Sequence, residues 1–288
     1  MHKNSVILLT GNRGFIGQRL ERLFKTNGYK VLGIDKDLCN ILDKEQLEIF
    51  FEEGKPDLVI HCAAAIGRLY GEDHPDEMVQ NNIQGTLNVV QLCTKYETPL
   101  INFATSEVSF ELTNMYGISK MAAETVVKHY CNNYGLNAIS VRPFMIYGGG
   151  QIPSKYKSAL DIFVSTALKG EPLTVHKATI RAWLHVEDFA RAILLLVEKY
   201  PINGFETFNI GSLDYRYMED VAKQIIKEVG SGSMNITGMP KFTTQVKKVC
   251  FDKLYDFLEF KSTISLEAGI RELIYWHKSY QQDQLQKS

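Results

Sequence analysis

Short apolar runs, rich in β-branched residues, recur along the first half of the chain and alternate with longer segments of helical periodicity. Each run is compact enough to be a strand buried on both faces of a parallel sheet. The expected strands are Val6–Thr10, Lys30–Ile34, Leu58–His61, Leu100–Ala104 and Ala138–Arg142. Between them, apolar residues three and four positions apart predict helices at Phe15–Asn27, Lys44–Glu53, Asp76–Tyr96 and Tyr116–Tyr134. This βαβαβ order predicts an α/β fold with a doubly wound parallel sheet.

The sequence pattern changes after the glycine triplet at 148–150. Beyond it, shorter elements are separated by Pro153, Pro172, Pro201 and Pro240. Helices are expected near Val186–Tyr200 and Met218–Val229, and a polar tail ends in QQDQLQKS. We therefore expect residues 1–150 to form the main domain, to which later segments can return, and residues 151–288 to form mainly a smaller lobe.

Composition is that of an ordinary globular protein. The 288 residues are 45% hydrophobic and 23% charged, which excludes collagenous, low-complexity and mostly disordered chains. Thirty-two basic residues stand against 33 acidic ones, for a net charge of -1, so no overall field favours nucleic acid or an anionic membrane. An anionic ligand must therefore be bound by a local site.

The cysteines and the lack of targeting segments indicate the cellular compartment. The five cysteines are scattered and form no CxxC pair, which favours reduced thiols and no zinc site. The chain begins without a secretory signal pattern, and no apolar stretch reaches the roughly 20 residues of a membrane helix. We expect a cytoplasmic protein with no membrane partner.

The first chemical signal is the sequence TGNRGFIG at 10–17, between the first strand and the first helix. Glycines there allow a dinucleotide pyrophosphate to approach free backbone N–H groups at a helix N-terminus. Asp35 ends the second strand, 18 residues beyond Gly17, where its carboxylate can accept both hydroxyls of an adenosine ribose and repel a 2′-phosphate. The open alternatives are a plain tight turn and a surface aspartate.

The second signal is YGISK at 116–120. Tyr116 and Lys120 are four residues apart on a predicted helix, so phenol and ammonium share a face and the cation can favour ionisation of the tyrosine. A free tyrosine has a pKa of about 10, so a base near neutral pH needs a shift of about 3 units, or about 4 kcal/mol. The alternative is an ordinary exposed pair.

Together with these two signals, further motifs match one enzyme family. They are HCAAA at 61–65, Asn82 in NNIQGTLNV, ATSEV at 104–108, VRPFMIYG at 141–148 and RAWLHVEDFARAI at 181–193. Residues 5–210 thereby resemble the extended short-chain dehydrogenase/reductases, in particular the NAD-dependent nucleotide-sugar epimerase/dehydratase group. The resemblance implies a Rossmann domain that binds NAD at 1–150 and a lobe at 151–288 that binds the nucleoside diphosphate of a sugar.

The resemblance also implies roles for individual residues. Thr105 would hydrogen-bond the sugar, Tyr116 would be the base, and Lys120 would contact the nicotinamide ribose. Asn40 and Ile41 stand where the family contacts adenine. The implied cofactor contacts are Gly11, Gly14, Phe15, Ile16, Gly17, Asp35, Asn40, Ile41, Ala63, Ala64, Asn82, Tyr116 and Lys120.

Two further groups are expected on the substrate side. Thr105-Ser106-Glu107 resembles the triplet of sugar dehydratases and decarboxylases, in which the acidic residue assists the step after oxidation; a loop cap explains Glu107 otherwise. Ser106 is expected at the substrate. Arg181 suits bidentate contact with a diphosphate, and a structural salt bridge is the alternative.

The chain departs from the family pattern in three places. Ser109-Phe110 stands where Tyr-Gly is usual, and Met145 where many relatives have Asn. Only 11 positions separate Thr105 from Tyr116, against about two dozen in the family. We therefore expect a more open or differently roofed sugar pocket.

Three functions are compatible with these residues. The favoured one is a redox-neutral NAD enzyme, an epimerase or dehydratase acting through a transient 4-keto-sugar. The alternatives are a 4-keto-sugar reductase that consumes external NAD(P)H and a non-catalytic NAD-bound sensor. His61 is expected as a packed residue and no metal site is indicated. The resemblance implies a homodimer through the helices at Asp76–Tyr96 and Tyr116–Tyr134.

Overall fold

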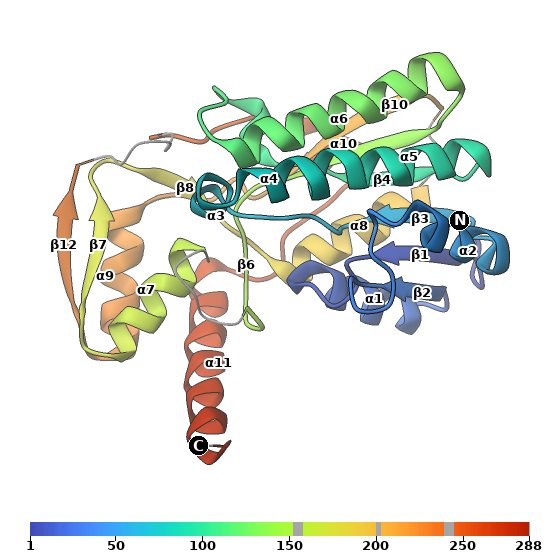
Figure 1. Ribbon diagram of the computed structural model, residues 1–288. Helices are drawn as coiled ribbons and strands as arrows, with labels where there is room; N and C mark the ends of the chain where they lie inside the picture. Colours follow the sequence, from blue (N-terminus) through green and yellow to red (C-terminus); the bar gives the residue numbers. More distant parts are fainter. Residues whose placement is uncertain (152–157, 200–202, 239–244, 288) are drawn as a thin grey trace. The chain divides into compact units, whose positions relative to one another are not determined.

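The computed structural model describes residues 1–151, 158–199, 203–238 and 245–287 (Figure 1). Contacts within the chain define two compact units. The first comprises Met1–Pro143, Phe189–Ile210 and Cys250–Phe260, and the second comprises Phe144–Asp188, Gly211–Val249 and Lys261–Ser288. Two later segments of the chain thus belong to the same unit as its first 143 residues.

A six-stranded parallel sheet is the framework of the first unit. Its strand order is β10-β5-β4-β3-β1-β2. The chain moves outward from β1 to β2, then returns to place β3 on the other side of β1, which makes the sheet doubly wound as predicted. The strands are β1 (Val6–Thr10), β2 (Lys30–Ile34), β3 (Leu58–His61), β4 (Leu100–Phe103), β5 (Ala138–Pro143) and β10 (Phe205–Ile210).

Helices cover both faces of this sheet (Figure 1). On one face, strand residues such as Leu8 and Val59 share a core with Phe51, Val89 and Val127 from three helices, α2, α5 and α6. On the other face Phe103 of β4 meets Phe189 of α8 edge to face at 5.7 Å. The helices of this unit are α1 (Phe15–Thr26), α2 (Lys44–Gly54), α3 (Arg68–Asp73), α4 (Pro75–Glu77), the π-helix η1 (Met78–Gln84), α5 (Gly85–Lys95), the 3-10 helix η2 (Ser106–Ser109), α6 (Met115–Tyr134), most of α8 (Val186–Lys199) and α10 (Asp252–Leu258).

One predicted helix is wrong in detail. The continuous helix expected over Asp76–Tyr96 is three segments, α4, η1 and α5, and the middle one is π-helical. Its buried residue Asn82 pairs with the backbone of Ala65, in the loop after β3. An apolar periodicity of 3.6 residues cannot reveal such a widened turn, because the hydrogen bonds of Asn82 are made to a loop that is distant in the sequence.

The helix α6, which carries Tyr116 and Lys120, is fixed at both ends. Asn114 caps its N-terminus by accepting a hydrogen bond from the Gly117 N–H at 2.8 Å. At the other end Gly135 has a φ of +74°, a left-handed conformation that costs glycine little, and its N–H donates to the Tyr130 carbonyl. These caps fix the residues at which the helix begins and ends.

The second unit has its own core, formed by three helices and short strands. Tyr147, Phe163, Trp183, Ile225 and Ile270 are among its buried residues. Its elements are β6 (Ile146–Tyr147), α7 (Ala159–Leu168), β7 (Pro172–His176), β8 (Ile180–Ala182), β9 (Leu184–His185), β11 (Tyr215–Tyr217), α9 (Met218–Val229), β12 (Ser233–Thr237) and α11 (Leu266–Lys287). The strands pair as β7 with β12, β8 with β11 and β6 with β9.

The polar tail expected from the sequence is helical. Residues 281–287 continue the helix α11. The apolar residues that hold this helix lie earlier, at Leu266, Ile270, Leu273 and Ile274, and its polar end extends from that anchored part. Among the helices of the described residues, none is both long and apolar enough to cross a bilayer.

Candidate active site

The glycine turn lies where β1 ends and α1 begins. Gly11 has a φ of +68°, and a Cβ on it would stand 2.7 Å from the Ala63 nitrogen. A Cβ on Gly17 would stand 2.1 Å from the Gly11 carbonyl oxygen. Only glycine is therefore tolerated at these two places. Gly14 caps α1 without a side chain, and Phe15 and Ile16 begin the helix, so the backbone N–H groups of its first turn have no side-chain cap.

Asp35 follows β2 and is held by backbone groups. Its Oδ1 accepts from the Lys36 N–H at 2.8 Å and its Oδ2 from the Arg13 N–H at 3.3 Å. The glycine turn therefore positions the carboxylate directly. Farther on, Asn40 is exposed and its side chain accepts from the Leu42 N–H, whereas Ile41 is buried.

The loop after β3 approaches the same turn. Ala63 donates its N–H to the Thr10 hydroxyl at 3.2 Å, and Ala63 and Ala64 are half-buried. Asn82 is fully buried: its side chain bonds both backbone groups of Ala65 and donates to the Ser119 hydroxyl at 2.9 Å. The structure thus places Asn82 as a tie between this loop and α6.

His61 lies at the end of β3 with both ring nitrogens engaged. Nδ1 is 2.7 Å from the Thr10 hydroxyl and Nε2 is 3.1 Å from the Thr86 hydroxyl. Burial, with the charge of Lys120 nearby, lowers the pKa of His61 to about 3, so the ring is neutral at physiological pH. In the described part of the chain, no three His, Cys, Asp or Glu side chains come together as a metal site would require.

Thr105 and Tyr116 meet at the end of β4. The Thr105 side chain hydrogen-bonds the Tyr116 phenol, which acts to lower the pKa of the phenol. Burial acts against it and is the larger effect, and the carboxylate of Glu107 acts in the same direction as burial. Together they raise the pKa of Tyr116 to about 12. The phenol is therefore protonated at neutral pH in the protein without ligand.

Lys120 is buried one helical turn beyond Tyr116, with 2% of its surface exposed. Burial lowers the pKa of its ammonium to about 8, although Cys62 and Glu124 act to raise it. The lysine lies close enough to His61 and Cys62 to affect the pKa of both. Cys62 begins the loop after β3, and the next residue of that loop, Ala63, contacts the glycine turn. The Tyr116–Lys120 pair therefore lies next to this loop.

Glu107 and Ser106 lie in the 3-10 helix η2, not on an extended strand end. Both are buried, and the Glu107 N–H donates to the Thr105 hydroxyl at 3.4 Å. The tight turn brings Glu107 near Tyr116. The carboxylate of Glu107 then acts electrostatically to raise the pKa of the phenol. The whole connection from Thr105 to Tyr116 consists of η2 and a short segment that ends in the helix cap Asn114.

Arg181 belongs to the second unit. It lies on β8 and is 5% exposed, and its guanidinium donates to the backbone carbonyls of Ile180 at 2.8 Å and Gln245 at 2.7 Å. Its expected role at a diphosphate stays a prediction. Met145, the departure from the family pattern, has a φ of +48° and packs against the core of that unit.

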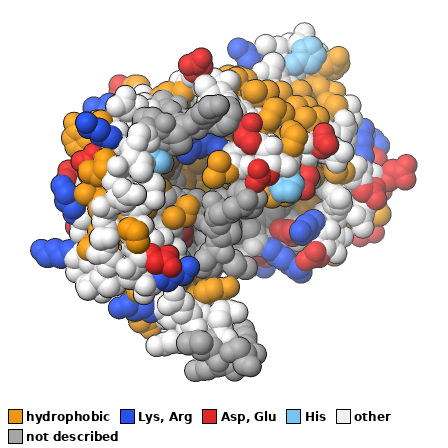
Figure 2. Space-filling view, turned by 60° about the vertical axis from the view of Figure 1, so that its left-hand side comes forward, with side chains coloured by type: hydrophobic (Ala, Val, Ile, Leu, Met, Phe, Trp, Pro, Cys, Tyr) orange, Lys and Arg blue, Asp and Glu red, His pale blue; other side chains and the backbone are white. Residues whose placement is uncertain are grey.

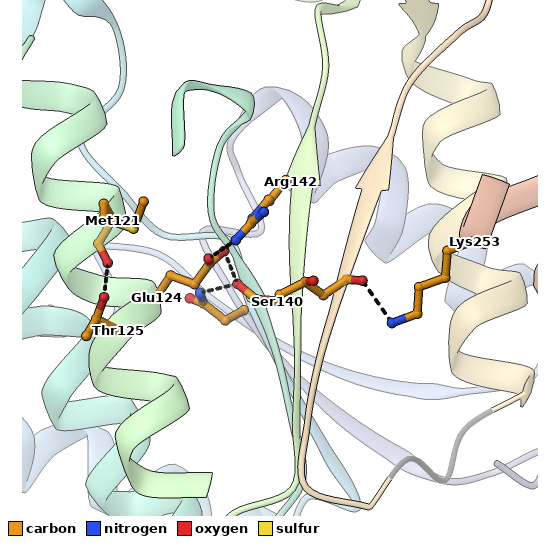
Figure 3. Close-up of polar contacts among 8 residues, drawn as sticks. Met121, Glu124, Thr125, Ser140, Arg142 and Lys253 are labelled. Atoms are coloured by element: carbon orange, nitrogen blue, oxygen red, sulfur yellow. Dashed lines mark hydrogen bonds and ion pairs between the residues drawn. The ribbon is translucent and has the colours of Figure 1, made fainter. Parts of the chain in front are cut away.

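Sequence reasoning gave no catalytic role to a polar network beside Lys120. Figure 3 shows Glu124 of α6 facing Ser140 and Arg142 of β5. Glu124 accepts from the Ser140 hydroxyl at 2.9 Å and from two guanidinium nitrogens of Arg142. The sequence signal was slight: Glu124 follows Lys120 by four residues, so the two share a helix face.

Hydrophobic side chains are also exposed on this unit. Val79 of η1 is 46% exposed and Ile118 of α6 is 44% exposed. Figure 2 shows hydrophobic side chains gathered at the upper right of its view, over the helices at the top of Figure 1. Exposed apolar surface is typical of protein contacts, and Val79 and Ile118 lie on the helices through which the family resemblance implies a homodimer.

A model of the NAD dependent epimerase/dehydratase family matches residues 7–211. Among curated relatives, a UDP-N-acetyl-alpha-D-glucosaminuronate decarboxylase from Bacillus cytotoxicus is 27% identical over 96% of this chain and 98% of the relative. A dTDP-glucose 4,6-dehydratase from Salmonella typhimurium is 26% identical over 94% of this chain and 92% of its own length.

Solved structures give the same result for the fold. Pal from Bacillus thuringiensis superposes with a TM-score of 0.87 at 25% identity, over 96% of this chain and 99% of that one. A UDP-glucose 4-epimerase from Thermotoga maritima, solved with UDP-glucose, also has a TM-score of 0.87, at 24% identity and the same coverage. The Rossmann-type fold predicted from the sequence is confirmed.

The buried ammonium of Lys120 should destabilise the fold. A pKa lowered to about 8 means that the folded protein holds this proton less tightly than the unfolded chain. We expect Lys120→Met to raise the free energy of unfolding by about 1 to 3 kcal/mol at pH 7. The gain should shrink as the pH rises above about 8, because the parent then loses the buried charge.

Urea denaturation at pH 7 and near pH 10 measures this gain. Lys128→Met is the matched control, since Lys128 is exposed two turns farther along α6 and should gain little. A Lys120→Met protein less stable than the parent at pH 7, or equally more stable at both pH values, would contradict the prediction.

Proposed function

The chain belongs to the NAD dependent epimerase/dehydratase family, and we propose that it binds NAD and converts a nucleotide sugar through a transient 4-keto-sugar. The observation that carries the proposal is the juxtaposition of Thr105, Tyr116 and Lys120 at the ends of β3 and β4, beside the glycine turn. Proteins similar in sequence and fold act on UDP- and dTDP-sugars by their names, which supports this substrate class.

The glycine turn and Asp35 fit a dinucleotide. A Cβ at Gly11 or Gly17 would fill the cradle at the N-terminus of α1, where backbone N–H groups suit a pyrophosphate. Asp35 offers a carboxylate that its two backbone donors keep oriented, as contact with ribose hydroxyls requires. Ala63, Ala64 and Ile41 would form apolar walls. When bound, NAD would accept a hydride from the sugar and later return it.

Tyr116 would take the proton from the sugar hydroxyl at carbon 4. To do so near neutral pH its pKa must fall from about 12 by about 5 units, or about 7 kcal/mol. The hydrogen bond from Thr105 lowers the pKa of the phenol. The positive charge of a bound, oxidised nicotinamide would lower it further. Burial strengthens these effects, since charges interact more strongly where water is excluded.

Glu107 would act after the oxidation. A ketone at carbon 4 acidifies the proton at carbon 5, and a dehydratase needs a second group to move it, because Tyr116 already holds a proton. Glu107 is 8% exposed and close enough to affect the Tyr116 pKa, so it is well placed for this step. In this proposal Ser106 also contacts the sugar, Arg181 binds the diphosphate, and a second copy of the chain packs on the helices η1, α5 and α6.

The proposed reaction is tested by mass spectrometry of nucleotide sugars incubated with the purified protein and NAD. Loss of water, loss of carbon dioxide, an unchanged mass with altered stereochemistry and a gain of two hydrogens identify the dehydratase, decarboxylase, epimerase and reductase reactions. Tyr116→Phe keeps the aromatic packing but removes the proton acceptor, so turnover should fall about a hundredfold to ten-thousandfold. Retention of turnover within about threefold of the parent would exclude Tyr116 as the base.

Cofactor choice is tested at Asp35. Asp35→Ala removes a charged acceptor for the ribose hydroxyls, so we expect NAD to bind about tenfold more weakly and the preference for NAD over NADP to narrow. Calorimetric titration with each cofactor measures both affinities. Equal affinity of the parent protein for NAD and NADP would overturn this assignment.

The role of Glu107 is tested by Glu107→Gln, which keeps the size of the side chain and removes its basicity. If the enzyme is a dehydratase, oxidised sugar should accumulate while the dehydrated product no longer forms. Glu111→Gln is the control, because Glu111 is an exposed carboxylate in the same connection. If Glu107→Gln eliminates water at the parent's rate, Glu107 has only a structural part.

A further inference from the structure

Glu124 and Lys120 occupy one buried face of α6. They are four residues apart, a spacing that brings side chains to the same side of a helix, about 5 to 6 Å apart at their Cβ atoms. Lys120 is 2% exposed and Glu124 is 5% exposed. Two opposite charges are thus buried within one helical turn of each other, next to the base Tyr116.

The carboxylate of Glu124 is held from the sheet (Figure 3). Arg142 donates to both of its oxygens, with Nε at 2.9 Å, and the Ser140 hydroxyl donates at 2.9 Å. Asn102 of β4 donates in turn to Ser140 at 3.3 Å. A carboxylate bound in this forked manner has little freedom to move, so β4 and β5 determine where the charge of Glu124 lies.

Glu124 is the anion that acts on Lys120 among the described residues. At the end of β3, His61 is neutral because its pKa is about 3, and burial raises the pKa of Cys62, so its thiol is also neutral. On α6 itself, Tyr116 is protonated and therefore uncharged. The carboxylate of Glu107, on η2, acts on Tyr116. Glu124 and Cys62 raise the pKa of Lys120, and near pH 7 only Glu124 of the two carries charge.

We propose that Glu124 is a positioning residue for the Tyr116–Lys120 pair: its carboxylate keeps the buried lysine protonated, and Arg142 sets how much of that negative charge the lysine experiences. The proposal rests on the proposed function only for the use of Lys120 beside the base. Removal of the carboxylate leaves Lys120 facing the charge of Arg142, whereas removal of Arg142 leaves Glu124 uncompensated. The two substitutions are therefore expected to shift the protonation of Lys120 in opposite directions.

The network is also open to water on its far side, which provides a control. Glu124 and Arg142 line a pocket of 470 Å³ together with Met121, Thr125, Lys128 and Glu206. Glu206 pairs with Lys253 of α10 rather than with Arg142. A charge removed at Glu206 changes the same pocket without touching the carboxylate that acts on Lys120.

The experiment is an NMR titration of protein labelled with carbon-13 in lysine, purified without cofactor, between about pH 6 and pH 10. The Lys120 side-chain signal is assigned from its loss in Lys120→Arg. We expect Glu124→Gln to lower the pKa of Lys120 by about one unit and Arg142→Gln to raise it by about half a unit or more. Glu206→Gln should leave it unchanged.

An unchanged pKa of Lys120 in folded Glu124→Gln, or a shift of the same sign in both variants, would overturn the proposal. Where Glu124→Gln does not fold, Arg142→Gln decides alone: an upward shift supports the proposal and no shift overturns it. The titration needs no substrate, so its failure is distinct from failure of the proposed function. With an active substrate in hand, the alkaline limb of the pH–rate profile, where Lys120 loses its proton, should move in the same direction as the pKa of Lys120 in each variant.

Discussion

The buried ammonium of Lys120, at the carboxyl end of the parallel sheet, is the constraint that the surrounding residues of the proposed site must satisfy. A buried cation is unfavourable unless anions and dipoles compensate it, and burial here lowers the lysine pKa to about 8. The neighbouring elements are arranged around this charge. The histidine at the end of β3 is neutral, and the anion Glu124, which acts on Lys120, is held by β5. The fold thereby keeps a protonated amine in a buried site.

The glycine turn lies at the same edge of the sheet. One loop, the loop after β3, links this turn to the helix that carries Lys120. Gly11 tolerates no side chain because the backbone of Ala63 lies against it, and Asn82 fastens that loop to α6 through Ala65 and Ser119. A displacement of the loop would move both the nucleotide cradle and the helix of the base. The buried amide that makes this link stands in the π-helix η1.

The sequence predicts best what is local. The limits of β1, β2 and β3 agree with the predicted runs. For β1 and β3 the reason is that strands buried on both faces need uninterrupted apolar residues. The glycine turn and Asp35 could be predicted because each directly follows one of these strands in the sequence. The π-helix, the tight turn at Ser106–Ser109 and the assignment of Phe189–Ile210 to the first unit are not, because each depends on contacts with distant segments. Glu124 resembles any helical surface charge until Arg142 of β5 is seen beside it.

The central claim is that a hydride leaves the sugar and returns to it, and isotope labelling tests this most directly. A nucleotide sugar that carries deuterium at carbon 4 is incubated with the protein and a catalytic amount of unlabelled NAD. The account predicts that the product keeps the deuterium and that the reaction runs to completion without added reduced cofactor. Loss of the label from the sugar, or a stoichiometric need for reduced cofactor, would contradict it.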